Sequence, residues 1–147
     1  MFSSYKLKMM KNWIILLFLL PVFCFAQRPS SGSFNYSNVK QSVFNRNKME
    51  FVKVSENANS DVNITFSSTN ITISDVRGRD FKIISLKNKR DENSYIYDYL
   101  LLDQLGKIYK LTTVLPKDFP KGTPDVSFYF MPTKDGSFDK VTSYSNN

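Results

Sequence analysis

The stretch "DVNITFSSTNITISD", Asp61 to Asp75, indicates the fold class of this chain. Every second residue is apolar on both sides of a short polar segment: Val62, Ile64, Phe66, Ile71 and Ile73. A period of two with many β-branched residues is typical of a β-hairpin that has one buried face and one solvent-facing face. A helix would need apolar residues spaced three or four apart, and that spacing is absent. The stretch therefore predicts two antiparallel strands joined near Ser68–Asn70.

The same alternation continues on both sides of this hairpin. Further strand-like segments lie at residues 49–55, 80–87, 94–103, 107–115 and 125–131, and the stretch 133–144 closes with a turn and a last strand. Turn-forming residues separate them, including Arg77–Arg79, Gln104–Gly106 and Asp135-Gly136, while three prolines between 116 and 124 forbid a central strand there. This spacing predicts a single all-β domain, an antiparallel meander of about seven strands.

Two architectures are compatible with such a meander. A small, calycin-like barrel is favoured because closure removes exposed sheet edges. A β-sandwich is the alternative, and the sequence leaves the choice open. The Gly-x-Trp signature of lipocalins is absent, since Trp13 is the only tryptophan in the chain, so no membership of that family is inferred.

The N-terminal segment "NWIILLFLLPVFCFAQ", Asn12 to Gln27, has a different character. An apolar run from residue 13 to residue 26 follows three lysines. It is shorter than the roughly 20 residues that a membrane-crossing helix needs. A basic lead, a short apolar centre and a small residue at the end predict a secretory signal peptide over residues 1–26, cleaved between Ala26 and Gln27.

This prediction places the protein outside the cytoplasm, in the periplasm or the medium, with no stable transmembrane anchor after cleavage. Lipid attachment at Cys24 is not expected because bulky Phe23 precedes it. Met1, Met9 and Met10 are all possible starts. Residues 27–40 read as a flexible polar spacer, although Phe34 and Tyr36 could instead dock as a first short strand, and residues 41–147 form the predicted domain.

The composition of the mature chain excludes several function classes. Residues 27–147 hold 17 basic and 13 acidic residues, a formal charge of +4 spread along the chain, which does not indicate nucleic-acid binding. They contain no Cys, His or Trp. Disulfide scaffolds, Ser-His-Asp and Cys-His catalysis, and thiolate or imidazole metal sites are thereby excluded. We expect no cofactor, no metal and no enzymatic activity; a carboxylate-dependent hydrolase is the minority alternative.

The segment "YIYDYLLL", residues 95–102, supplies the candidate binding residues. Tyr95, Tyr97 and Tyr99 share one face of a strand with Leu101. Tyrosine combines a flat apolar body with a polar tip, which suits ligand sites and interfaces, although tyrosines are also good strand formers. Asp98 lies among apolar neighbours and needs a partner, for which the sequence offers Lys110 on the next strand. An ion pair at the surface is the simpler interpretation of these two charges.

Two non-enzymatic functions follow from this pattern. The first is binding of a small apolar or amphipathic ligand, with the tyrosine row as the wall of the site. The alternative is a protein–protein interaction module of the bacterial cell envelope. A closed cavity would favour the first function, and an exposed apolar strand face would favour the second.

Overall fold

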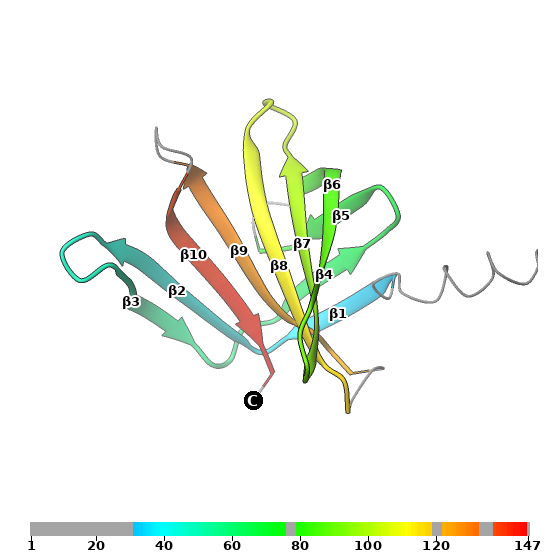
Figure 1. Cartoon of the computed structure of the whole chain (residues 1–147), viewed down its shortest axis with the longest axis horizontal. Helices are drawn as coiled ribbons and strands as arrows, with labels where there is room; N and C mark the ends of the chain where they lie inside the picture. Colours follow the sequence, from blue (N-terminus) through cyan, green and yellow to red (C-terminus); the bar gives the residue numbers. More distant parts are fainter. Residues whose placement is uncertain (1–30, 76–78, 119–121, 133–136, 147) are drawn as a thin grey trace, which may run out of the picture.

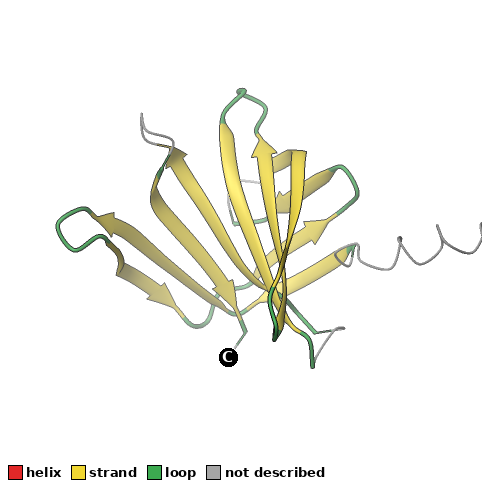
Figure 2. Ribbon diagram, viewed as in Figure 1, coloured by secondary structure: helices red, strands yellow, loops and turns green. Residues whose placement is uncertain are grey.

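A computed structural model describes residues 31–75, 79–118, 122–132 and 137–146. Within these ranges the chain forms strands and no helix (Figures 1 and 2). The ten strands are β1 Gly32–Tyr36, β2 Asn38–Asn45, β3 Glu50–Asn57, β4 Val62–Phe66, β5 Asn70–Ile73, β6 Arg79–Arg90, β7 Ser94–Leu102, β8 Ile108–Pro116, β9 Asp125–Pro132 and β10 Phe138–Ser145. The predicted all-β class is confirmed.

All ten strands belong to one antiparallel sheet in the order β1-β4-β5-β6-β7-β8-β9-β10-β2-β3. From β4 to β10 the order follows the chain, so this part is the expected meander. The sheet curls into a half-barrel whose strands converge near the joint between β1 and β2 and spread at the opposite end (Figure 1). The architecture is one continuous curled sheet and not two stacked sheets.

The hairpin that indicated the fold forms as the sequence predicts. Ile64 of β4 pairs with Ile73 of β5, and both side chains are fully buried. Ser67 closes the turn, because its backbone N–H donates to the Asn70 carbonyl at 2.9 Å and its hydroxyl accepts the Asn70 N–H at 2.9 Å. Local alternation and a serine turn thus determine this part of the sheet.

The strand count differs from the prediction of about seven, because β1 and β2 were not recognised as strands. Residues 32–40, which the sequence assigns to the spacer, form β1 and the start of β2. The other interpretation, in which Phe34 and Tyr36 dock as a first short strand, describes these residues. β1 alternates the polar residues Ser33 and Asn35 with Phe34 and Tyr36 of the core side, while β2 buries the polar residues Asn38 and Ser42, so the apolar period of two is weak in both.

The first four strands form one long ribbon that bends at Ser37. β2 pairs with β3 and β1 pairs with β4, while Ser37 alone separates β1 from β2. At the bend, the Ser60 N–H donates to the Ser37 carbonyl at 2.8 Å. The half made of β1 and β4 extends the sheet beyond β5, and the half made of β2 and β3 extends it beyond β10. Because the ribbon is continuous, the two ends of the β5-to-β10 meander come together at this bend.

The side chain of Asn146, just after β10, connects the end of β10 to β1 and to the bend at Ser37. Its side-chain carbonyl accepts the Ser37 N–H at 2.9 Å and the Ser37 hydroxyl at 3.3 Å. Its side-chain amide donates to the Asn35 carbonyl at 2.8 Å. The asparagine thereby replaces the ladder hydrogen bonds that would otherwise be missing between β1 and β10.

Aromatic packing supports the same junction from inside. The rings of Tyr36 on β1 and Tyr144 on β10 lie 6.0 Å apart, and each residue is 1% exposed. The buried Tyr36 hydroxyl donates to the Pro124 carbonyl at 2.8 Å, so its polar end is satisfied. Burial of two such rings stabilises the bend through both apolar area and ring contact.

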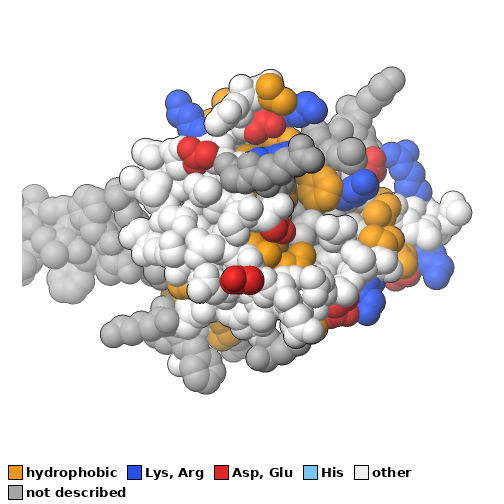
Figure 3. Space-filling model, turned by 180° about the vertical axis from the view of Figure 1, so that it is seen from behind, with side chains coloured by type: hydrophobic (Ala, Val, Ile, Leu, Met, Phe, Trp, Pro, Cys, Tyr) orange, Lys and Arg blue, Asp and Glu red, His pale blue; other side chains and the backbone are white. Residues whose placement is uncertain are grey.

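The concave face of the half-barrel holds the hydrophobic core. Its members come from eight strands: Tyr36, Val62, Ile64, Phe66, Ile71, Ile73, Phe81, Tyr97, Tyr99, Leu101, Tyr109, Leu111, Val126, Phe128 and Tyr144. The convex face is more polar. Between β1 and β4 it carries a side-chain ladder in which Ser33 bonds Thr65 at 2.6 Å and Asn63 donates to Asn35 at 2.7 Å. Figure 3 shows this half of the surface as mostly uncharged and polar.

The predicted signal peptide, residues 1–26, lies outside the described residues. Within the described part of the chain, no helix has the length and apolar character required to cross a membrane.

Removing the side chain of Asn146, which fastens β10 to β1 through hydrogen bonds, should destabilise the half-barrel. We expect Asn146→Ala to lower the free energy of unfolding by about 1 kcal/mol, since the lost hydrogen bonds lie at the surface. Urea denaturation measures this change. Asn59→Ala, in the turn before β4, is the control, because the Asn59 side chain makes no hydrogen bond among the described residues. Equal effects of the two substitutions would contradict the fastening role.

Candidate functional site

In the structure, the predicted site residues lie on both faces of the sheet formed by β7 and β8. Tyr97, Tyr99 and Leu101 point to the concave face and are buried, and half-buried Tyr95 packs against their cluster. Asp98 lies on the opposite, convex face of the strand, because neighbouring side chains alternate. Lys110 joins Asp98 there, as the ion pair shows. The six residues therefore do not form a single site.

The tyrosine row is packed against the rest of the core. The ring of Tyr99 lies 6.0 Å from the ring of Phe66, because the curl of the sheet brings β4 across the interior. Tyr97 is 7% exposed and Tyr99 is 3% exposed. Burial raises the pKa of both hydroxyls, so both stay protonated. These positions match the simpler interpretation of the row, in which the tyrosines fill a half-buried strand face.

Asp98 is the centre of a small polar cluster on the convex face. Its carboxylate accepts the Thr112 hydroxyl at 2.6 Å and pairs with Lys89 at 2.8 Å and Lys110 at 3.7 Å. The partnership with Lys110 that the sequence suggested is thus present, and Lys89 of β6 is closer still. Lys110 also lies over the ring of Tyr129, 5.4 Å from its centre.

These contacts decide the charge of Asp98. Burial acts to raise its pKa, but the hydrogen bonds from Lys89 and Thr112, with the charge of Lys110, outweigh burial and lower it below the ordinary value. Asp98 is therefore ionised at neutral pH and structurally paired. Such an acid is a poor candidate for proton transfer near pH 7.

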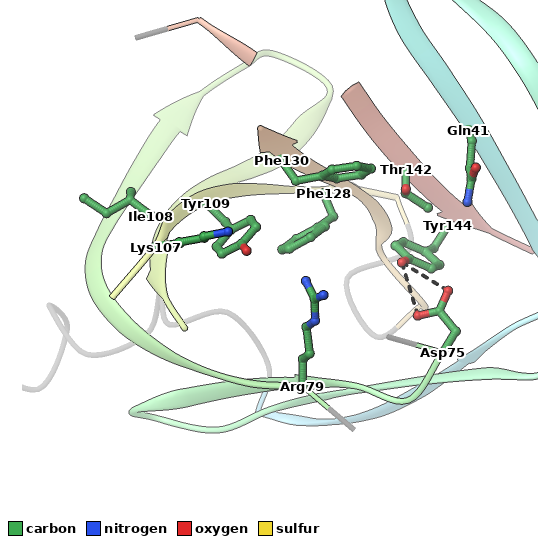
Figure 4. Close-up of a pocket in the computed structure, with 10 residues that line it drawn as sticks. All are labelled: Gln41, Asp75, Arg79, Lys107, Ile108, Tyr109, Phe128, Phe130, Thr142 and Tyr144. Atoms are coloured by element: carbon green, nitrogen blue, oxygen red, sulfur yellow. Dashed lines mark hydrogen bonds between the residues drawn. The ribbon is translucent and has the colours of Figure 1, made fainter. Parts of the chain in front are cut away.

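The concave face also contains a cavity of about 760 Å³, and the tyrosine row of β7 is not part of its lining (Figure 4). Its lining comes from five strands and two connections: Gln41, Asp75, Arg79, Lys107, Ile108, Tyr109, Phe128, Phe130, Thr142 and Tyr144. A volume of this size lies within the usual range for small-molecule sites, about 300–1,000 Å³. None of the residues singled out from the sequence is among these ten.

Aromatic side chains of β8 and β9 form one wall of the cavity. The rings of Tyr109 and Phe128 are stacked with centres 5.4 Å apart, and Phe130 continues the row 5.9 Å from Phe128. Phe81 supports this wall from within the core, since its ring lies 5.3 Å from Tyr109 and 5.1 Å from Phe128. The wall is apolar, flat and held in place on one side.

The hydroxyl of Tyr109 is positioned by the β7–β8 turn. It donates to Asp103 at 3.0 Å, while the other oxygen of Asp103 accepts the N–H groups of Leu105 and Lys107, each at 2.8 Å. Gly106 in this turn has φ of 78°, as expected for the glycine of a tight connection. A turn residue thereby orients a side chain of the cavity.

Arg79, at the start of β6, extends into the cavity between the aromatic wall and the Asp75–Tyr144 pair (Figure 4). Burial raises the pKa of Tyr109, as does the bond to Asp103, while Arg79 acts in the opposite direction because its charge lies beside the hydroxyl. The ion pairs within 4.0 Å among the described residues do not include Arg79.

The opposite side of the cavity is polar. The Tyr144 hydroxyl donates to both oxygens of Asp75, at 3.3 and 3.4 Å. Burial raises the pKa of Asp75, although the bond from Tyr144 lowers it in part. Gln41 and Thr142 complete this side. An amphipathic molecule could therefore place its apolar part on one wall and its polar part on the other.

Sequence reasoning missed this site for a physical reason. Alternation assigns Tyr109, Phe128 and Phe130 to one face of their strands, but it cannot show which inward residues meet a packed interior and which meet a cavity. The available signal was weak: Arg79 is a cation two residues before buried Phe81, on the same inward-facing side of β6. A charge on an otherwise apolar face suggests a polar interior.

Among the described residues, no group of three or more His, Cys, Asp or Glu side chains is arranged to hold a metal ion. The chain matches no family model, no curated protein and no solved structure in the comparisons made.

A second surface feature lies at the end of the sheet. All eight residues of β3 are exposed, and within the described ranges β3 pairs with β2 alone. Phe51, Val52 and Val54 are 40%, 38% and 60% exposed, and Met49 before the strand is 75% exposed. Figure 3 shows apolar side chains among charged ones at this end of the molecule. The strand presents an unpaired backbone edge with apolar neighbours.

The pairing of Asp98 gives a pH-dependent prediction. A lowered folded pKa means stabilisation that is present above the unfolded pKa, about 3.9, and is lost as pH falls through the folded value. We expect Asp98→Asn to lower the free energy of unfolding by about 1 kcal/mol at pH 7, allowing for solvent screening.

Urea denaturation at pH 7 and pH 2.5, roughly a unit below the unfolded pKa, measures this difference. The gap between the two proteins should shrink as the pH falls toward the lowered folded pKa of Asp98, because protonation removes the charge that pairs with Lys89 and Lys110. Asp139→Asn is the control, because the Asp139–Arg46 pair is 3.6 Å long and both side chains are exposed. A gap that persists unchanged in acid would assign the effect to packing.

Proposed function

We propose that this protein is a non-enzymatic binder of a small apolar or amphipathic molecule, which it holds in the cavity on the concave face. The observation that carries the proposal is the combination of a 760 Å³ cavity with a stacked aromatic wall. Ligand sites are typically concave and mostly apolar, with a few polar groups that fix orientation. The site residues proposed are those of the cavity.

The carboxyl groups support binding over hydrolysis. Asp75 is the one acid among the ten lining residues, and it is occupied by the Tyr144 hydroxyl. Hydrolysis of the glycosidase type needs a pair of carboxyl groups facing each other across the substrate. The carboxylate of Asp103 accepts hydrogen bonds from its own turn and from the Tyr109 hydroxyl.

The predicted signal peptide places this binding activity in the periplasm or outside the cell. A mature chain without cysteine needs no disulfide formation there. A half-barrel that is fastened by side chains and aromatic packing can hold an apolar ligand away from water in such a compartment.

Removing part of the aromatic wall should weaken binding. Phe130 is partly buried and lines the cavity, so Phe130→Ala should raise the Kd for the neutral fluorescent probe N-phenyl-1-naphthylamine about tenfold. Fluorescence titration measures the Kd. Phe51→Ala, the same change on the β3 edge, should leave the Kd unchanged. Thermal melting shows that both variants are folded, and equal losses in both would contradict cavity binding.

The free edge of β3 supports a second candidate function, an interaction module of the cell envelope. An extended segment of another protein can add to an unpaired edge through main-chain hydrogen bonds, with apolar side chains adding contacts. Soluble proteins usually protect such edges with charges, bulges or covering elements. β3 carries Lys53 and Glu56, which pair with each other at 2.8 Å, and a bulge at Val54, yet apolar side chains of this strand stay exposed.

A charge on the edge tests this second function. We expect Val54→Lys to abolish capture of an envelope protein while leaving probe binding in the cavity intact, because an added lysine opposes strand addition. Affinity capture from the host envelope, followed by direct binding of the recovered protein, measures the effect. Retention of the same partner at the same affinity by the variant would exclude the β3 edge.

A further inference from the structure

We infer that the molecule held in the cavity is an amphipathic anion, whose charged group binds Arg79 and whose apolar body lies on the aromatic wall. This inference rests on the proposed function and adds the chemical class of the ligand. It is carried by the position of Arg79, which directs its guanidinium into the cavity without a carboxylate within 4.0 Å among the described residues (Figure 4).

A guanidinium in this position has unused donors. It carries five N–H groups in a fixed plane, an arrangement that suits carboxylate, sulfonate and phosphate groups. Its neighbour in the structure is the neutral hydroxyl of Tyr109, whose proton is already donated to Asp103. An anion arriving between Arg79 and the polar side of the cavity would therefore meet donors that no acid among the described residues has taken.

The other charges around the cavity are consistent with an anion. Lys107 is a second cation among the lining residues, and Asp75 is the one acid. The negative charge of Asp75 is partly satisfied by the Tyr144 hydroxyl, and burial raises the pKa of its carboxyl, which lowers the free-energy cost of protonating it when an anion approaches. Asp103, outside the lining, is held by two backbone N–H groups of its turn.

The aromatic wall indicates that the ligand has an apolar body in addition to its anionic group. Tyr109, Phe128 and Phe130 form a continuous stacked row beside Arg79, so a bound molecule can contact the rings and the guanidinium together. A small inorganic anion would gain no apolar contact with this wall. The site thus fits a molecule with an aromatic or aliphatic body and one anionic group.

Two dyes that share the same rings separate charge from apolar contact. 1-Anilinonaphthalene-8-sulfonate carries a sulfonate, and N-phenyl-1-naphthylamine lacks it. We expect the sulfonate dye to bind the mature protein about tenfold more tightly. Arg79→Gln should remove this preference and leave the Kd of the neutral dye unchanged. Arg46→Gln, in the turn between β2 and β3, is the matched control and should preserve the preference.

Each outcome has a distinct meaning. Equal affinity of the two dyes, with both weakened by Phe130→Ala, would overturn the anionic ligand and leave the proposed function standing. Failure of both dyes to bind would overturn the proposed function as well. Displacement of the sulfonate dye by methanesulfonate at low concentration would overturn the amphipathic requirement, because that anion lacks the apolar body. A similar loss in the two arginine variants would exclude Arg79 as the anion site.

Discussion

The bend of the N-terminal ribbon at Ser37 is the constraint on which the rest of the half-barrel depends. Because one residue joins β1 to β2, and these strands pair with opposite ends of the meander, the sheet has to curl until its ends meet. Asn146 then supplies side-chain hydrogen bonds in place of missing ladder bonds, and the Tyr36–Tyr144 contact fills the space behind them. Polar and apolar interactions thus act on the same junction.

This curl also explains why the interior is packed in one region and hollow in another. Where β4 crosses the concave face, Phe66 meets Tyr99 and the space is filled. Where the strands spread, Phe81 packs against Tyr109 and Phe128, and the cavity lies beside these rings. The cavity is therefore a consequence of sheet geometry, and the residues that line it point to the concave side from strands β2, β6, β8, β9 and β10 and from two connections.

The charged residues on the convex and concave faces of the sheet differ in whether they have a partner of opposite charge. On the convex face, Asp98 is surrounded by Lys89, Lys110 and Thr112, so it is a paired structural acid. On the concave face, Arg79 has no such carboxylate among the described residues, while Asp75 is bonded to a tyrosine hydroxyl. A cation that has no carboxylate within 4.0 Å in the described part of the chain, placed beside an apolar wall, distinguishes the cavity from the Asp98 cluster.

The sequence alone determined the all-β class, the β4–β5 hairpin and the order of the later strands, because these depend on local alternation and on turn residues such as Ser67 and Gly106. It also suggested the Asp98–Lys110 pair, since neighbouring strands bring those residues together. Only the tertiary structure decided the rest. The polar strands β1 and β2 gain their order from partners far along the chain, and the cavity residues come from five strands that the curl of the sheet brings around one space. Alternation assigns a side chain to a face of the sheet, but long-range closure decides whether it meets another side chain or an open space.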